Sequence, residues 1–385
     1  MVVTKSGRTK EVKTFRIEYD DITPYGLALE ELQDEIDAHE IIVGFNLKFD
    51  LHWLRRYGIV LSAIDAVFDC QLAEFILGKQ REPYPSLGGT CERRELGRKI
   101  DIVKEQYWER GLDTTQVPWD ILKNYCVRDI ELTERLYLEQ ALDLHEAGLM
   151  PLFTMQNEDL LILEEMEWNG LRYNMEAALA RGKEIDAEIS RIDADLRCLV
   201  PVGDLNYRSN AHLSAIIYGG VLHRPVRERV TRTLADGREV QSERWGTEAV
   251  ELKGFTKPIR GTEHVKTKNL SLEDLVRTNK ARTEAGKTPL ERQWSVAGPV
   301  LKRLNVKSAK GNQFVEALLR RSELEKQNNT YYTGLVEKME PMDWPQDHIH
   351  GNLNQCVAVT SRLSSSGPNL QNFSGECKDL FYTRF

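Results

Sequence analysis

Two pairs of polar residues have the types and the spacing that metal-dependent chemistry requires. Asn46 precedes Asp50 by four residues, and Tyr125 precedes Asp129 by four residues. Side chains at this spacing share one face of an α-helix. Carboxylates that converge from two helices can bind hard cations such as Mg²⁺, and a tyrosine one turn away can orient a water molecule. Either pair alone is more often an ordinary pair on a solvated helix, so only the two together indicate a site.

A run of amide and hydroxyl side chains near the C-terminal end suits a different task. Residues 350–372 contain one arginine, Arg362, and no Asp or Glu. Such side chains donate or accept hydrogen bonds without adding negative charge, which suits a surface facing phosphates, sugars and base edges. A loose apolar alternation predicts a strand over the first half of the run, and residues 366–369 predict a turn. A Ser/Asn-rich loop has a similar composition, so composition alone does not decide for nucleic acid.

Strands that alternate with helices would position the two polar pairs. Apolar periodicity predicts, in chain order, a strand over 12–19, a helix over 27–39, a short buried strand over 41–44, a helix over 46–54, a strand over 66–68, a helix over 69–77 and a long helix over 119–145. This order predicts an α/β sheet domain. From residue 150 the pattern changes to a helix–turn–helix that runs to about 196, with Gly170 as the stop signal.

A long charged helix is predicted over residues 314–338. Its Arg320, Arg321 and Lys326 could follow the backbone of a nucleic-acid duplex. A solvated helix face explains the same charges equally well, and both interpretations stay open.

The composition excludes a membrane-spanning protein and a generally basic nucleic-acid binder. No run of 18 apolar residues occurs, and the N-terminus lacks the apolar region of a signal peptide. Six cysteines without a C-x-x-C pair indicate reduced thiols in a cytoplasmic protein. The net charge of −8 is unevenly distributed, because residues 221–310 carry 20 Lys and Arg against 11 Asp and Glu. A local basic patch of this kind is enough to bind phosphates.

The two polar pairs, with residues 43–50 and 68–74 around and between them, resemble the second and third motifs of the DnaQ-like 3′–5′ exonuclease fold. That fold is the proofreading domain of family A DNA polymerases. The resemblance implies two-metal phosphodiester hydrolysis with Mg²⁺, or with Mn²⁺ in its place. It assigns metal ligation to Asp50 and Asp129, water positioning to Tyr125, and orientation of the carboxylates or the terminal nucleotide to Asn46. Asp69 is expected to cap the helix that follows it.

The polar run has the order Thr360-x-Arg362-Leu-Ser-Ser-x-x-Pro-Asn369-Leu-Gln371-Asn372. It resembles the segment of family A DNA polymerases, the DNA polymerase I type, that leads into the palm and holds the primer–template. The resemblance implies that Arg362 reaches the minor groove at the primer end. Asn369, Gln371 and Asn372 would contact sugars and base edges, and Thr360 belongs to the same DNA-binding set. Reading features common to all correct base pairs suits an enzyme that copies any sequence.

The resemblance implies an α/β fold class with three regions. These are a DnaQ-like (ribonuclease H-like) exonuclease domain over 1–147, a mainly α-helical polymerase thumb over 148–345 with a basic insertion at about 221–295, and the start of the polymerase palm over 346–385. The exonuclease domain is expected to lack its first strand or strands, because only one strand and one helix precede the short strand that leads into Asn46. The nearest substitute for the missing Asp-x-Glu motif is Glu18 with Asp20, but solvent-facing acids on an edge strand explain these better.

The implied parent function is template-directed DNA synthesis with 3′–5′ proofreading. The sequence lacks the family's polymerase metal-binding aspartates and fingers, so we expect a fragment of such a polymerase. Because the Asp-x-Glu motif of the exonuclease is missing too, we expect the isolated chain to be weak or inactive as a nuclease. Two alternatives are half of a split polymerase that needs a C-terminal partner, and a non-catalytic or nuclease-only DNA-binding protein. Expected partners are primer–template DNA, single-stranded 3′ ends and a processivity factor, with dNTPs bound only by the complete enzyme and no membrane. A phage-like protein in the cytoplasm of a bacterial host would fit.

Overall fold

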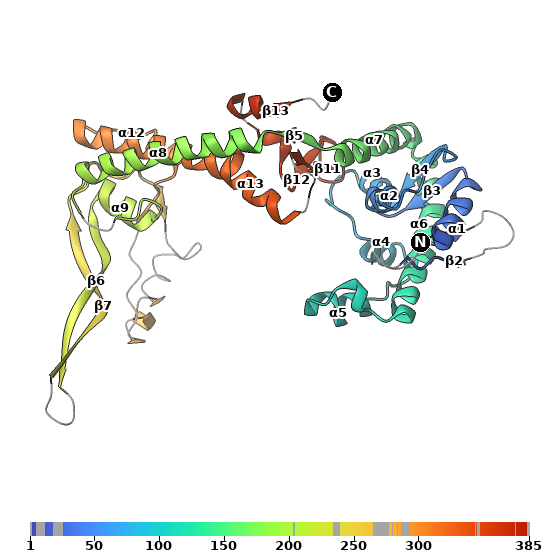
Figure 1. Ribbon diagram of the computed structural model, residues 1–385, viewed down its shortest axis with the longest axis horizontal. Coiled ribbons are helices and arrows are strands. Elements are labelled where there is room, and N and C mark those ends of the chain that lie inside the picture. The colour runs from blue at the N-terminus through green and yellow to red at the C-terminus, as the bar shows by residue number, and fades with distance from the viewer. Residues whose placement is uncertain are drawn as a thin grey trace. The chain divides into compact units, whose positions relative to one another are not determined.

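The computed structural model divides into two compact units, each with its own hydrophobic core (Figure 1). The terminal unit comprises Met1–Asn174 with Met342–Phe385, and the middle unit comprises Met175–Pro341. The structure describes residues 2–4, 12–17, 26–202, 205–233, 239–264, 277–278, 280–282, 284–285, 293–342, 344, 347–373 and 375–382. In these residues, no helix is both long and apolar enough to cross a membrane.

A parallel pair of strands with a helical crossover supports the candidate site. β3 (Ile41–Gly44) pairs in parallel with β4 (Ala66–Asp69), and α2 (Leu47–Arg56) connects them, as parallel pairing requires. Three leucines of α2 at helical spacing are buried. β3 is less buried than expected, since Ile41 is half exposed. The predicted alternation is therefore present, although in the described residues the parallel sheet has only these two strands.

The rest of the terminal unit is mostly helical. Its further elements are β1 (Val2–Thr4), β2 (Val12–Thr14), α1 (Gly26–Asp37), α3 (Cys70–Leu77), α4 (Leu87–Arg93), α5 (Ile102–Gln106), α6 (Trp119–Glu146) and α7 (Met150–Asn169). α3, α6 and α7 pack around a core that includes Phe68, Phe75, Leu132 and Phe153. The strand predicted over 12–19 ends at residue 14, and residues 18 and 19 lie outside the described part.

Short antiparallel strands complete the terminal unit. β5 (Leu171–Tyr173) pairs with β10 (His348–Ile349) and β13 (Phe381–Tyr382), so a strand follows Gly170 where the sequence predicted only a turn. β11 (Asn352–Asn354) pairs with β12 (Ser364–Ser366). The strand predicted over the first half of the polar run is thus limited to three residues, because the chain bends away after Asn354 before it returns as β12.

The middle unit combines helices with a long antiparallel hairpin. Its principal elements are α8 (Met175–Leu199), α9 (Asn210–Tyr218), β6 (Gly220–Thr233), β7 (Glu239–Leu252), β8 (Glu263–His264), β9 (Gln293–Trp294), α11 (Gly298–Leu301), α12 (Ala309–Tyr331) and α13 (Thr333–Met339). β6 and β7 pair along their whole lengths, within the basic stretch noted in the sequence. The long helix predicted over 314–338 is broken at Tyr332, whose backbone leaves the helical region and separates α12 from α13.

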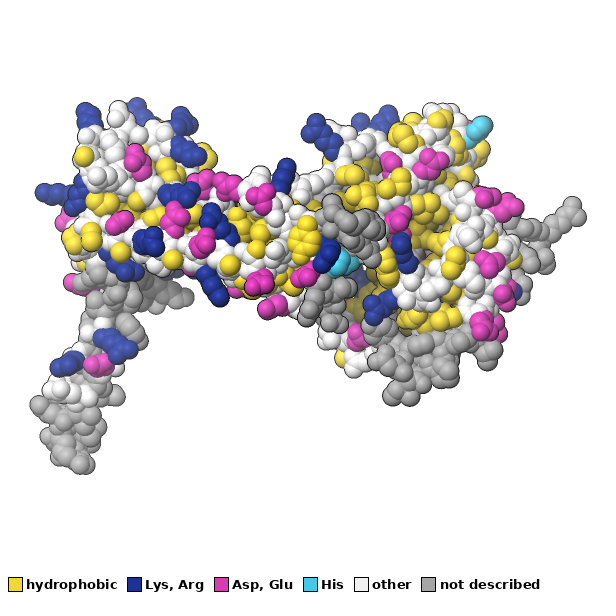
Figure 2. Space-filling view, turned by 45° about the horizontal axis from the view of Figure 1, so that its top comes forward, with side chains coloured by type: hydrophobic (Ala, Val, Ile, Leu, Met, Phe, Trp, Pro, Cys, Tyr) yellow, Lys and Arg dark blue, Asp and Glu magenta, His cyan; other side chains and the backbone are white. Residues whose placement is uncertain are grey.

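The charged residues of α12 mostly serve its packing against α8. Arg321 is only 7% exposed, and its guanidinium donates to Asp193 at 2.6 Å and to Glu325 at 2.8 Å. Arg320 pairs with Glu188 of α8 at 3.0 Å. Figure 2 shows Lys and Arg side chains interspersed with Asp and Glu on this part of the visible surface. The interpretation that Arg321 follows a duplex backbone is therefore wrong, because Asp193 and Glu325 already neutralise its charge within the unit.

Candidate functional site

Asp69 organises the start of both helices that flank the parallel strands. Its carboxylate accepts hydrogen bonds from the backbone N–H groups of Gln71 and Leu72, which confirms the predicted cap of α3. The same carboxylate accepts from the N–H groups of Asn46 at 3.1 Å and Leu47 at 3.0 Å. Burial raises the pKa of Asp69, while these backbone donors act in the opposite direction. One buried side chain thereby fixes where α2 and α3 begin.

Asn46 precedes α2 instead of lying within it. Its backbone is left-handed, with φ 58° and ψ 48°, and its exposed side chain makes no capping hydrogen bond. The prediction that Asn46 and Asp50 share a face of one helix is therefore wrong in detail, since the helix begins at Leu47. Asp50 lies in the first turn of α2. Crowding by neighbouring protein atoms and the charge of Asp69 raise the pKa of Asp50 to about 6, although its side chain still reaches solvent.

The second pair lies on α6, one turn apart, and it has a partner that the sequence did not reveal. The ammonium of Lys99 is 2.8 Å from Asp129 Oδ2 and 4.8 Å from the centre of the Tyr125 ring. Burial lowers the pKa of Lys99, but its bonds to Asp129 and Tyr125 outweigh this effect and raise it. Burial likewise raises the pKa of Asp129, and Lys99 opposes that change. Lys99 lies in the loop between α4 and α5, so no helical spacing relates it to Asp129.

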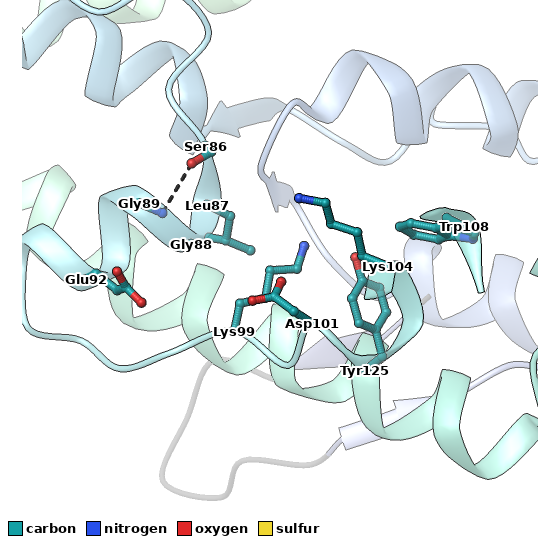
Figure 3. A pocket seen from close by; sticks show the side chains of 10 residues that line it. All are labelled: Ser86, Leu87, Gly88, Gly89, Glu92, Lys99, Asp101, Lys104, Trp108 and Tyr125. Atoms are coloured by element: carbon teal, nitrogen blue, oxygen red, sulfur yellow. Dashed lines mark hydrogen bonds between the residues drawn. The ribbon is translucent and has the colours of Figure 1, made fainter. Parts of the chain in front are cut away.

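A cavity of about 400 Å³ opens beside Tyr125. Figure 3 shows that Lys99, Asp101 and Lys104 approach it from the loop and from α5, and that Trp108 lies across from Tyr125. The rings of Trp108 and Tyr125 meet edge to face at 5.9 Å. The cavity therefore combines two ammonium groups with aromatic surface, next to the α6 carboxylate.

Asp129 lies on α6, and the charge of Asp50 on α2 acts on Cys126 of α6. Burial raises the pKa of Cys126, and the charges of Asp129 and Asp50 both contribute. No three His, Cys, Asp or Glu side chains form a metal-binding group in the described residues. Asp129 Oδ1 is buried, and it has no hydrogen-bond partner in this part of the chain.

This arrangement fits a divalent cation that keeps several water molecules, which Mg²⁺ does readily. The available oxygen of Asp129 and the solvent-accessible carboxylate of Asp50 are the protein groups that could hold it. Glu18 and Asp20, the substitutes considered from the sequence, lie outside the described residues.

The predicted DNA-binding residues flank β12 on both sides, but they differ in availability. Thr360 and Arg362 are exposed, and the Arg362 guanidinium has no ion-pair partner among the described residues. The Asn369 side chain instead accepts from the Gln371 N–H at 3.1 Å, and the Gln371 amide donates to the Leu363 carbonyl at 3.0 Å. These two amides brace the turn. Asn372 is exposed.

A buried glutamate links α2 with the polar run, and sequence patterns did not reveal it. Glu167 of α7 accepts from Lys48 at 2.6 Å, from His52 at 2.9 Å and from the backbone N–H of Leu353. Lys48 also donates to the Leu353 carbonyl. The helix that carries Asp50 is thereby tied to β11, the strand that opens the polar run.

Two families match the chain in sequence order. Residues 16–144 match the 3′–5′ exonuclease family, and residues 235–382 match DNA polymerase family A. The chain is 23% identical to DNA polymerase I of Treponema pallidum over 332 residues, which cover 86% of this chain and 26% of that protein. It is 23% identical to the DNA polymerase of Bacillus phage SP01 over 374 residues, which cover 89% of this chain and 36% of that protein. The chain thus spans about a quarter to a third of the length of these relatives.

A solved structure has the same fold over most of the chain. It is the POL domain of Pol1 from M. smegmatis in complex with DNA primer-template and dNTP, with a TM-score of 0.59 and 16% identity, covering 95% of this chain and 49% of that one. The fold likeness spans both matched regions. Residues 16–144 are thus similar to the 3′–5′ exonuclease family and residues 235–382 to DNA polymerase family A, in that order along the chain.

Proposed function

We propose that this chain acts on DNA in template-directed synthesis, with a region that trims single-stranded 3′ ends and a region that holds the primer–template. The observation that carries this proposal is the order of the two matches, exonuclease at 16–144 and family A polymerase at 235–382, in one chain. The relatives named above are DNA polymerases of bacteria and of a phage. We therefore propose a replication protein that acts in the cytoplasm of a bacterium, encoded by the bacterium or by a phage.

We propose a ribonuclease H-like, DnaQ-type fold for residues 1–147, with the first strand or strands missing. The parallel β3–α2–β4 unit followed by the long helix α6 supports it. Residues 148–345 would form the thumb, with the β6–β7 hairpin inside its basic insertion, and residues 346–385 the start of the palm. Primer–template DNA and single-stranded 3′ ends are the proposed substrates. DNA synthesis from dNTPs would also need the further polymerase residues of the longer relatives. A partner chain is one possible source of these residues.

In the proposed exonuclease site, Asp50 and Asp129 would hold divalent cations, Mg²⁺ or Mn²⁺. A bound cation would stabilise the negative charge that develops on the phosphodiester during hydrolysis. Tyr125 lies one turn from Asp129 with its ring against Trp108, which restricts the direction of its hydroxyl and suits it to position the attacking water. Asn46, exposed at the start of α2, can donate to the terminal nucleotide.

The trimming activity can be tested with the purified chain, 3′-labelled single-stranded DNA and Mg²⁺. We expect slow trimming that falls at least about tenfold in Asp50→Ala and in Asp129→Ala, because each variant removes a carboxylate from the cation site. Glu146→Ala is the matched control, since that carboxylate lies exposed at the last residue of the same helix as Asp129.

Trimming that persists in both aspartate variants would overturn the assignment of the site. Retained DNA binding without any trimming would instead favour a non-catalytic DNA-binding protein. A processivity factor, the other proposed partner, would increase the length of DNA processed per binding event without changing the requirement for Asp50.

A further inference from the structure

Lys99, which lines the cavity, binds one carboxylate oxygen of Asp129. Its ammonium is 2.8 Å from Asp129 Oδ2, and the two side chains are 23% and 22% exposed. The ammonium also lies over the Tyr125 ring at 4.8 Å. A positive charge is thus already bound to the carboxylate that the proposed function assigns to a divalent cation.

A divalent cation and the Lys99 ammonium cannot both sit close to Oδ2. Two cations in van der Waals range repel each other strongly at a partly buried site. The remaining oxygen, Oδ1, is buried, so a cation that approaches from the solvent-accessible cavity meets Lys99 first. The cation must therefore displace the ammonium to use the whole carboxylate.

The cavity beside Lys99 can accommodate its ammonium group when a cation displaces it from Asp129. The cavity beside it has a volume of about 400 Å³, and the carboxylate of Asp101 lines the same space (Figure 3). A lysine has a flexible aliphatic stem that can move its charge without moving the backbone. The neighbouring Lys104 lines the cavity too, but its ammonium pairs with Glu109 at 3.9 Å instead of with Asp129.

We propose that Lys99 is a positioning residue that competes with the divalent cation for Asp129. It holds the carboxylate in place while the cation is absent, and it moves into the cavity when the cation binds. This inference rests on the proposed function, because it takes Asp129 as a cation ligand. Lys99 thereby sets the cation concentration at which the site fills.

The test is the affinity of the intact chain for Mn²⁺ alone, measured by the electron paramagnetic resonance signal of the free ion. We expect Lys99→Met to tighten binding about tenfold, since it removes the competitor while keeping the apolar stem. Lys104→Met, which removes a charge from the same cavity, should change the affinity by less than about threefold. Lys99→Arg keeps the charge and should bind Mn²⁺ as the unaltered chain does.

Asp129→Asn in the Lys99→Met background should abolish the gain, which locates it at this carboxylate. An affinity that is unchanged or weaker in Lys99→Met would overturn the proposal, as would an equal gain in Lys104→Met. Trimming is not part of this readout. If no variant trims DNA but Lys99→Met still tightens Mn²⁺ binding, the proposed function fails and the competition stands.

Discussion

His52 lies between two carboxylates of α7, at 3.3 Å from Glu164 and 2.9 Å from Glu167. Burial lowers its pKa, but its interactions with both glutamates outweigh burial and raise the pKa from 6.5 to about 9. A raised folded-state pKa contributes stability that is complete below pH 6.5 and is lost as the pH rises through 9. Lys48 pairs with Glu167 and Arg55 pairs with Glu164, and the ring of Trp168 stacks on His52. These are the other charged and aromatic groups around the imidazole in the described part of the chain.

We expect His52→Gln to lower the free energy of unfolding by on the order of 1–3 kcal/mol at pH 6 and by the least at pH 9.5. The melting temperature should fall accordingly, most at pH 6. Calorimetry at both pH values measures the difference. His145→Gln, at an exposed position in the last turn of α6, is the control substitution. A penalty for His52→Gln that stays constant between the two pH values would contradict the proposed charge pairing.

At the scale of elements, α8 passes unusually close to the junction of α12 and α13. A Cβ at Gly182 would lie 2.2 Å from Thr333 Oγ1 and 2.9 Å from Asn328 Oδ1. Asn328 is buried and donates to Asp186 of α8 at 2.8 Å, so it cannot simply move away. Glycine is therefore required for the close approach of these helices.

We expect Gly182→Ala to destabilise the middle unit by about 1 kcal/mol, because overpacking exceeds the helix propensity that alanine gains. Urea unfolding would measure it. Gly298→Ala is the control, since its Cβ would meet no atom closer than Leu319 at 4.0 Å. Adding Thr333→Ala to Gly182→Ala should restore part of the loss. If Gly182→Ala is as stable as the parent, the close approach of α8 to the α12–α13 junction does not require glycine.

For the whole molecule, charge is distributed in a way that permits DNA binding despite a net charge of −8. Many cations are neutralised internally, as Arg321 and Lys48 are, so binding must depend on a few exposed ones. Arg362 is exposed beside β12 and has no ion-pair partner in the described residues. It is the cation that the resemblance to family A DNA polymerases predicts at the primer end.

We expect Arg362→Ala to weaken binding to primer–template DNA about fivefold and to reduce the salt dependence by about one phosphate contact. Binding to single strands should hardly change. Fluorescence anisotropy at several salt concentrations measures both. Arg98→Ala removes another exposed cation, with a side chain 87% exposed and 3.6 Å from Glu92, and serves as the control. Equal losses on both kinds of DNA would refute the primer-end assignment.

The sequence by itself determined the approximate ranges of α2, α3 and α6, the cap at Asp69 and the resemblance to family A DNA polymerases. Helix periodicity and capping are local properties, since the groups that decide them lie within a few residues of each other. This is why α2, α3 and α6 lie close to their predicted ranges. Where a helix end depends on an unusual backbone, as at Asn46 and Tyr332, local patterns placed it incorrectly.

Only the tertiary structure decided how the site is held together. Lys99 meets Asp129, and Glu167 meets Leu353 across 186 residues, through contacts that no sequence spacing predicts. The same holds for Arg321, whose charge on an amphipathic helix looks available until α8 packs against it. The physical reason is that a side chain's charge is set by its type, whereas the partner that neutralises it is set by which elements pack together.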